Sequence, residues 1–176
     1  MEVENKFLKG AVLPPIIRFS IPLMLSLVLQ ALYGAVDLIV VGYFSQTSDI
    51  SAVATGSQTM QAFTTLVTGL TMGVTVCIGQ AVGAGDNDRI GRIAAGQIKL
   101  FSVVTVVITA MVMAFCDKIV VLMNVPDAAC AAASDYIKIC ASGMIFITGY
   151  NGVSGFLRGM GNSKTPFLFV AVACGI

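Results

Sequence analysis

The sequence predicts an all-α polytopic membrane protein, and two observations carry that prediction. Hydrophobic residues make up 57% of the 176 residues and charged residues only 11%, with a mean hydropathy of +0.92, whereas soluble domains carry about 25% charged residues. The apolar residues also lie in runs long enough for helices of about 20 residues, the length that crosses a bilayer. These runs predict four complete transmembrane helices, near residues 19–44, 52–82, 93–115 and 136–157.

A fifth helix is predicted to start at residue 166. The segment from Pro166 to Ile176 is too short to cross a bilayer, because at least about 17 residues are needed. We therefore expect the chain to be a fragment of a longer protein whose remaining helices are absent from it. Residues 1–18 are predicted to form a cytoplasmic N-terminal segment, and residues 19–176 the membrane domain.

The first span, Phe19 to Phe44, carries an acid, Asp37. At about 100° per residue, Gln30, Tyr33 and Asp37 fall on one helix face, together with Ser26. A charged side chain at the bilayer centre costs at least ~2.5 kcal/mol, so such a residue usually faces a bundle interior or a wet cavity. We therefore predict that Asp37 is a reversible proton carrier and that Gln30 and Tyr33, on the same face, are its neighbours in a cavity. The alternative is structural: Asp37 reaches water near the helix end, or bonds Tyr33 and holds helices together.

The second span is rich in hydroxyl and amide side chains. Several of them recur at spacings of three and four residues and therefore share one side of a helix, where they can line a cavity: Gln61, Thr64, Thr68, Thr71 and Thr75. The alternative is that the threonine hydroxyls bond carbonyl groups of their own helix. In that interpretation the glycine pairs, Gly69 with Gly73 and Gly79 with Gly83, simply allow close helix packing.

The distribution of Lys and Arg predicts the orientation of the chain. One set of loops and flanking segments holds Lys6, Lys9, Arg18, Arg89, Arg92, Arg158 and Lys164, whereas the other set holds Lys118. By the positive-inside rule, the N-terminus is cytoplasmic.

Two local charge patterns predict contacts. Asp86 or Asp88, in the turn before the third span, is placed to cap the next helix. In the fourth span, Asp135 and Lys138 are predicted to pair, because residues three apart are neighbours on a helix surface.

Composition excludes several classes of function. The chain has no histidine, and its five cysteines show no C-x-x-C spacing, so neither a metal site nor a disulfide framework is predicted. The net charge is +1 without a basic block, which argues against a nucleic-acid partner. One central acid without histidine is not a catalytic constellation, so we do not expect an enzyme.

Three stretches carry a resemblance to a known family. They are IRFSIPLMLSLVLQALYGAVDLIVVG at the first span, IGQAVGAGDNDR at the turn after the second, and FLRGMGNSKTPF before the fifth. In this order and at these positions, they resemble the multidrug and toxic compound extrusion (MATE) family over nearly the whole chain. The resemblance implies that the chain is part of the N-terminal six-helix lobe of a twelve-helix transporter.

What the resemblance implies about function is secondary active multidrug efflux, in which cationic or amphiphilic small molecules leave the cytoplasm in exchange for H⁺ or Na⁺. Asp37 falls where family members carry the first-helix acid that takes part in cation or proton coupling. The implied partners are drugs or metabolites and the lipid bilayer of the plasma membrane, and no cofactor is implied besides the coupling ion. The alternative is a lipid-linked oligosaccharide flippase of the same wider superfamily. Such a protein is expected to have several cationic residues facing its cavity, and the spans offer Lys99 and Lys138.

Overall fold

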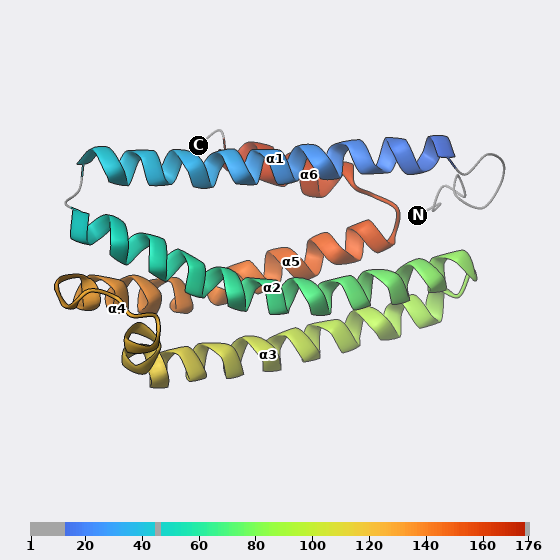
Figure 1. The fold of residues 1–176 in the computed structure, drawn as a ribbon. Coiled ribbons are helices and arrows are strands. Elements are labelled where there is room, and N and C mark those ends of the chain that lie inside the picture. The colour runs from blue at the N-terminus through green and yellow to red at the C-terminus, as the bar shows by residue number, and fades with distance from the viewer. Residues whose placement is uncertain (1–12, 45–46, 175–176) are drawn as a thin grey trace. The chain divides into compact units, whose positions relative to one another are not determined.

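The structure is a computed structural model and describes residues 13–44 and 47–174. In this part of the chain the regular elements are all α-helices (Figure 1), which confirms the predicted fold class. Their bounds are α1 Leu13–Phe44, α2 Thr47–Gly83, α3 Asn87–Leu122, α4 Asp127–Ser142, α5 Met144–Gly159 and α6 Lys164–Cys174. By length and composition, α1, α2 and α3 can each cross a membrane, and α4 with α5 passes the same test as a bent pair.

Contacts divide the chain into two compact units. The first unit consists of residues up to Gly34, Leu70–Ile98 and the residues from Gly152 onward. The second unit consists of Ala35–Gly69 and Lys99–Asn151. The helices α1, α2, α3 and α5 each contribute residues to both units.

The turn between α2 and α3, in the first unit, is built by glycine and aspartate. Gly85 has a positive φ of 69°, which glycine adopts without steric cost. The amide groups of Gly85 and Asp86 donate to the carbonyl groups of Val82 and Ala81, at 3.1 and 3.0 Å, so orphan carbonyls of α2 are satisfied. The Asp86 carboxylate then accepts a hydrogen bond from the amide of Arg89 at 2.8 Å. The predicted cap of the third span is therefore confirmed at Asp86.

The N-terminal and third helices are longer than the spans predicted from hydropathy. The helix α1 begins at Leu13, so part of the predicted N-terminal segment continues the first span. Pro14 and Pro15 fit there, because the first turn of a helix does not need their missing amide protons. The helix α3 runs from Asn87 to Leu122 and includes Asp117 and Lys118, which hydropathy had placed in a connection.

The fourth span is broken, which hydropathy did not predict. Instead of one helix over residues 136–157, α4 ends at Ser142 and α5 begins at Met144, with a bend of 47° between them. The Ser142 hydroxyl donates to the Ile139 carbonyl at 2.6 Å, and such local side-chain bonds compete with helix continuation. Thr109 of α3 donates to the carbonyl of Ala141 at 3.4 Å, close to the break.

The core of the second unit lies among α2, α3, α4 and the start of α5. Its buried residues are Ala52, Met60, Val67, Ile108, Val112, Cys116, Val120, Val125, Ala129, Ala133, Ile137, Ala141 and Met144. On α3 and α4 these residues recur every four positions, as expected for one buried face of each helix. The stripe on α4 consists mostly of alanine, and such small side chains let helices approach closely.

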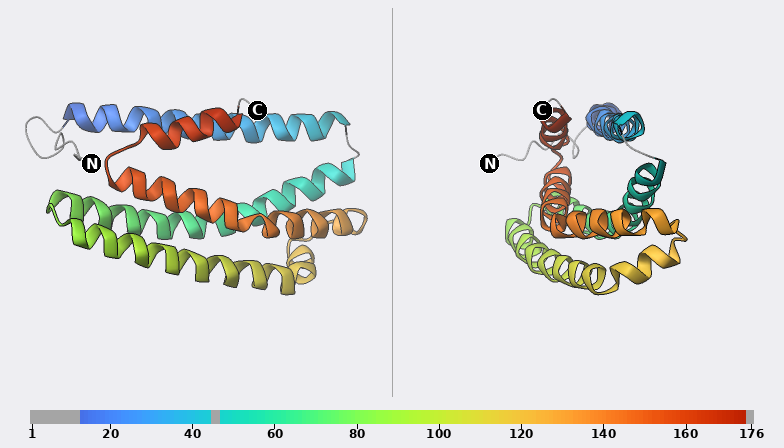
Figure 2. Two further views of the ribbon diagram at one scale, coloured as in Figure 1. Left: turned by 180° about the vertical axis from the view of Figure 1, so that it is seen from behind. Right: turned by 90° about the vertical axis from the view of Figure 1, so that its left-hand side faces the viewer.

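In the first unit, α5 packs closely on α2 through glycine. A Cβ atom added at Gly159 would lie 2.8 Å from the Ile78 Cβ and 2.8 Å from the Thr75 carbonyl oxygen, and one at Gly155 would also meet Thr75. The side-chain amide of Gln97 in α3 donates to the Gly152 carbonyl at 2.7 Å. In both ribbon views of Figure 2, α6 lies beside the part of α1 that belongs to this unit.

The sequence had assigned close packing to other glycines. A Cβ atom added at Gly69 or Gly73 would meet nothing within 4 Å among the described residues. At Gly79 the nearest atom, the Gly159 carbonyl oxygen, is at an ordinary distance of 3.8 Å. The tight helix contact is therefore made by α5 glycines, Gly155 and Gly159, and not by the Gly69 pair.

This packing yields a prediction. Gly159→Ala should destabilise the protein by about 1–3 kcal/mol, because the added methyl group meets a backbone carbonyl that cannot move aside. Thermal unfolding of the purified protein in detergent measures the change. Gly149→Ala in the same helix is the matched control, because its Cβ has open space. Equal melting temperatures for the two variants would show that α5 and α2 do not pack in this way.

Candidate functional site

The predicted coupling acid, Asp37, lies on the part of α1 that belongs to the second unit. It is exposed in this chain. Its carboxylate is close enough to the Tyr136 hydroxyl of α4 to act on it electrostatically.

Tyr136 is held against α2. Its hydroxyl lies 3.0 Å from the hydroxyl of Ser57, and either group can donate. Its ring covers Gly56, where a Cβ atom would collide with it. A half-buried tyrosine usually finds a hydrogen-bond partner for its hydroxyl, and here Ser57 supplies it. Sequence analysis did not single out Tyr136 or Ser57. In α2, the small residue Gly56 next to the hydroxyl of Ser57 was the signal that could have indicated this contact.

The predicted cavity residues of α2 bond mainly within their own helix. The hydroxyls of Thr64, Thr68 and Thr75 donate to the carbonyls four residues earlier, each at 2.9 Å. This agrees with the structural alternative, in which the threonine hydroxyls satisfy helix carbonyls. Gln61 is exposed, and its carbonyl accepts from Thr65 at 2.8 Å. A role for Gln61, Thr64 and Thr68 in lining a cavity stays a prediction.

Two of these threonines also contact α5. The Thr75 hydroxyl lies 2.9 Å from the Gly155 carbonyl oxygen, to which it can donate. The Thr68 hydroxyl lies 3.5 Å from the side-chain oxygen of Asn151, which is a long and weak contact. The Asn151 side-chain amide donates to the Ile147 carbonyl at 2.8 Å. Asn151 was not singled out from the sequence, because a lone amide in a glycine-rich helix end carries no pattern.

The predicted stripe on α1 is divided between the units. Gln30 and Tyr33 belong to the first unit and are exposed, Tyr33 at 63% of its surface. Ser26, which shares their face, is buried, and its hydroxyl donates to the Pro22 carbonyl at 2.9 Å. That carbonyl lies one turn before Ser26, so the hydroxyl is satisfied within α1.

The helix α5 carries buried polar atoms at a spacing of four residues. The Tyr150 hydroxyl, the Ser154 hydroxyl and the Arg158 Nε are buried and have no hydrogen-bond partner in the described part of the chain. A buried polar group without a partner costs about 1–3 kcal/mol, so such a group calls for a functional explanation. Sequence analysis had treated residues 136–157 as an apolar span and had placed Arg158 in the loop that follows, whereas α5 includes it.

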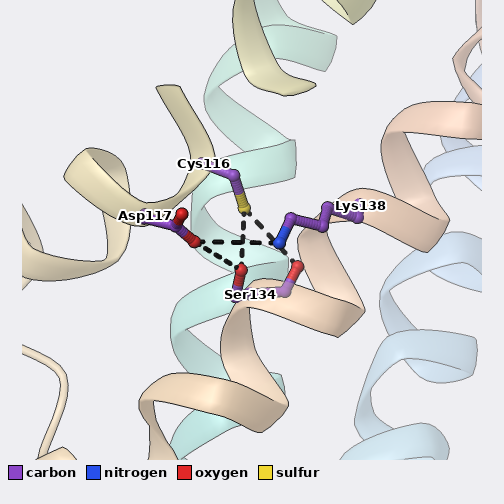
Figure 3. Close-up of polar contacts among 4 residues, drawn as sticks. All are labelled: Cys116, Asp117, Ser134 and Lys138. Atoms are coloured by element: carbon purple, nitrogen blue, oxygen red, sulfur yellow. Dashed lines mark hydrogen bonds and ion pairs between the residues drawn. The ribbon is translucent and has the colours of Figure 1, made fainter. Parts of the chain in front are cut away.

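A polar cluster joins α3 to α4 within the second unit (Figure 3). The Ser134 hydroxyl donates to the Asp117 Oδ1 at 3.0 Å, and the Lys138 Nζ lies 3.7 Å from the same oxygen. The prediction that Asp135 pairs with Lys138 is therefore wrong. Lys138 points toward α3, where it meets the Asp117 carboxylate. Asp117, Asp135 and Lys138 all line one open cavity of about 380 Å³.

Comparison with known proteins decides the family. The MatE family model matches residues 22–176. This chain belongs to the MATE family. The family prediction is therefore confirmed, and the chain is a multi-pass membrane protein.

Several MATE relatives are similar along most of this chain. It is 29% identical to the probable multidrug resistance protein YoeA of Bacillus subtilis over 97% of the chain and 37% of that protein. It is 28% identical to the probable multidrug resistance protein NorM of Thermotoga maritima over 87% of the chain and 33% of that protein. The chain thus spans less than two fifths of the length of these relatives.

Solved MATE structures share the fold. The crystal structure of a MATE protein in complex with MaD3S matches 99% of this chain and 39% of that protein, with a TM-score of 0.90 and 25% identity. An outward-facing multidrug resistance MATE transporter matches 99% of the chain with a TM-score of 0.87. The matching part is the N-terminal lobe, as the sequence predicted.

The contact between Ser57 and Tyr136 yields a second prediction. Ser57→Ala and Tyr136→Phe should each lower stability by about 0.5–1.5 kcal/mol, and the double variant should be no worse, because both changes remove one hydrogen bond. Thermal unfolding measures all three. Tyr150→Phe serves as the control: its hydroxyl has no partner in the described residues, so its loss should be neutral or stabilising. Additive losses for Ser57 and Tyr136 would refute a shared bond.

Proposed function

We propose that this chain forms the N-terminal part of a secondary active multidrug efflux transporter in the plasma membrane. The observation that supports it most strongly is the match to the MatE family over residues 22–176, together with the shared fold. Relatives that cover most of this chain are named as multidrug resistance proteins. The substrates proposed are cationic or amphiphilic small molecules, exported in exchange for H⁺ or Na⁺, and the protein is a transporter and not an enzyme.

Asp37 is the proposed coupling group. A carboxylate within a span can hold either a proton or a cation, and it is tolerated where water or other polar groups reach it. Protonation from outside neutralises Asp37, changes its hydrogen bonds and lowers the affinity for a bound cation. Deprotonation toward the cytoplasm restores that affinity.

The remaining predicted site residues have supporting roles in this proposal. Gln30 and Tyr33 share a helix face with Asp37 and are exposed in this chain, so they are available to line a substrate path. Gln61, Thr64 and Thr68 supply polar groups along α2. Alternating access, with one lobe moving against the other, is the transport cycle that fits a two-lobe architecture.

The flippase alternative is less well supported. An anionic lipid-linked substrate calls for unpaired cationic residues in the cavity. Lys138 is paired with Asp117, and Lys99 is the other cation in the predicted spans. Export of a cationic substrate therefore fits the described charges better.

The test of the coupling proposal is efflux of a fluorescent cationic dye from cells that make the full-length protein, under imposed proton or sodium gradients. Asp37→Asn should reduce gradient-driven efflux to the level of cells without the protein, because the neutral amide cannot exchange a proton. Asp88→Asn is the matched control, since Asp88 is an exposed acid in the first turn of α3. Normal gradient dependence in Asp37→Asn, at normal protein level, would refute the coupling role.

Orientation is proposed from the positive-inside rule, with the N-terminus in the cytoplasm. A cysteine at position 87 then lies on the cytoplasmic side and a cysteine at position 127 on the outside. In intact cells, a membrane-impermeant maleimide should label Asp127→Cys and should label Asn87→Cys only after the membrane is opened. Labelling of the unsubstituted protein gives the background from its own cysteines. Labelling of Asn87→Cys in intact cells, with Asp127→Cys labelled only after the membrane is opened, would show the opposite orientation.

A further inference from the structure

The helix α4 makes polar contacts on two opposite sides. Tyr136 contacts α2, with its hydroxyl 3.0 Å from that of Ser57, and interacts electrostatically with Asp37 of α1. Ser134 and Lys138 lie two residues before and after Tyr136. Two residues turn a helix through about 200°, so they face the other way, toward α3.

On the α3 side, one carboxylate oxygen of Asp117 interacts with both polar side chains of α4, Ser134 and Lys138. Asp117 Oδ1 accepts a hydrogen bond from the Ser134 hydroxyl at 3.0 Å and lies 3.7 Å from the Lys138 Nζ (Figure 3). The buried Cys116 thiol adds a contact to the Ser134 carbonyl oxygen at 3.5 Å. We call Asp117, Ser134 and Lys138 the α3–α4 latch.

Two kinds of contact determine how α4 is rotated about its own axis: the packing of its buried face and the polar contacts on its two sides. The helix is separated from α5 by the break at Gly143, with its bend of 47°, so helix continuity does not hold it. Its core face consists of Ala129, Ala133, Ile137 and Ala141. This face is fully buried and includes Ile137, so its packing resists rotation. The polar contacts on the two sides add to that packing.

We propose that Asp117 and Lys138 are positioning residues for Tyr136: by holding α4 to α3, the latch keeps the Tyr136 hydroxyl on Ser57. The consequence for transport rests on the proposed function, in which Asp37 is the coupling group. The geometric part, the position of Tyr136 against α2, stands on contacts within one unit of the structure.

The exposure of the latch limits the size of its effect. The Asp117 side chain is 87% exposed and the Lys138 side chain 42%. An exposed ion pair shifts an equilibrium by no more than about fivefold. Variants of the latch should therefore fold and reach normal protein levels, and their effects should lie between about twofold and fivefold.

The experiment uses Ser57→Cys in the full-length protein as a reporter, because its thiol takes the place of the hydroxyl that the Tyr136 hydroxyl contacts and can itself form a weak hydrogen bond. A membrane-permeant maleimide labels the cysteine, and the rate is compared with that of the same protein with Ser57 intact. Lys138→Met and Asp117→Asn should each raise the labelling rate by about two- to fivefold. The double variant should match the single ones, since both remove one ion pair.

Two controls separate positioning from a general loss of charge. Lys138→Arg keeps the cation and should label like the reporter alone. Asp135→Asn removes an acid that lines the same cavity without an ion pair in the described residues, and it should also leave the rate unchanged. An increase in Asp135→Asn equal to that in Asp117→Asn would overturn the proposal.

Dye efflux by the same latch variants, with Ser57 intact, supplies the transport readout. The maximal rate should fall by about two- to fivefold while the half-saturating dye concentration stays the same, because the latch does not contact the dye. An unchanged labelling rate in Lys138→Met and Asp117→Asn would overturn the proposal whatever Asp37→Asn does. Faster labelling in Lys138→Met and Asp117→Asn, together with normal ion coupling in Asp37→Asn, would support the positioning of Tyr136 and refute the coupling role of Asp37.

Discussion

The constraint on which this structure depends is that backbone polar groups must find partners within the protein, because the bilayer core offers no water. Long helices satisfy most of these groups internally. The exceptions are helix ends and breaks, and there the chain supplies specific partners. Asp86 caps α3, the amides after α2 bond its last carbonyls, and Thr109 bonds a carbonyl near the break between α4 and α5.

The same constraint explains how the helices pack. Since lipid is as apolar as leucine, helices in a membrane gain association energy mainly from close approach and from polar contacts. The glycines of α5 let its backbone approach Thr75 and Ile78 of α2. In the second unit, alanines of α4 and the glycine at position 56 have the same effect. Larger side chains at these positions would separate the helices that carry the polar groups.

Polar groups in the candidate site are arranged by these close contacts. Tyr136 reaches Ser57 because Gly56 leaves room for its ring. On the other side of α4, Lys138 and Ser134 share one oxygen of Asp117. The short helix α4 thus makes polar contacts with α2 on one side and with α3 on the other.

The sequence by itself determined the helical membrane fold and the family. These features depend on composition, local periodicity and contiguous motifs, which are readable within one stretch of chain. Asp86 as a cap could likewise be predicted, because a cap bonds within three residues of itself.

Only the tertiary structure decided which side chains meet. Ser57 and Tyr136 are separated by 79 residues and Asp117 and Ser134 by 17, so no local pattern links them. For this reason the sequence predicted an ion pair between Lys138 and Asp135, its neighbour on the helix. In the structure Lys138 pairs with Asp117 of α3 instead. The break at Gly143 was missed because hydropathy averages over a span, whereas a break depends on a few hydrogen bonds and on the helices that pack beside it.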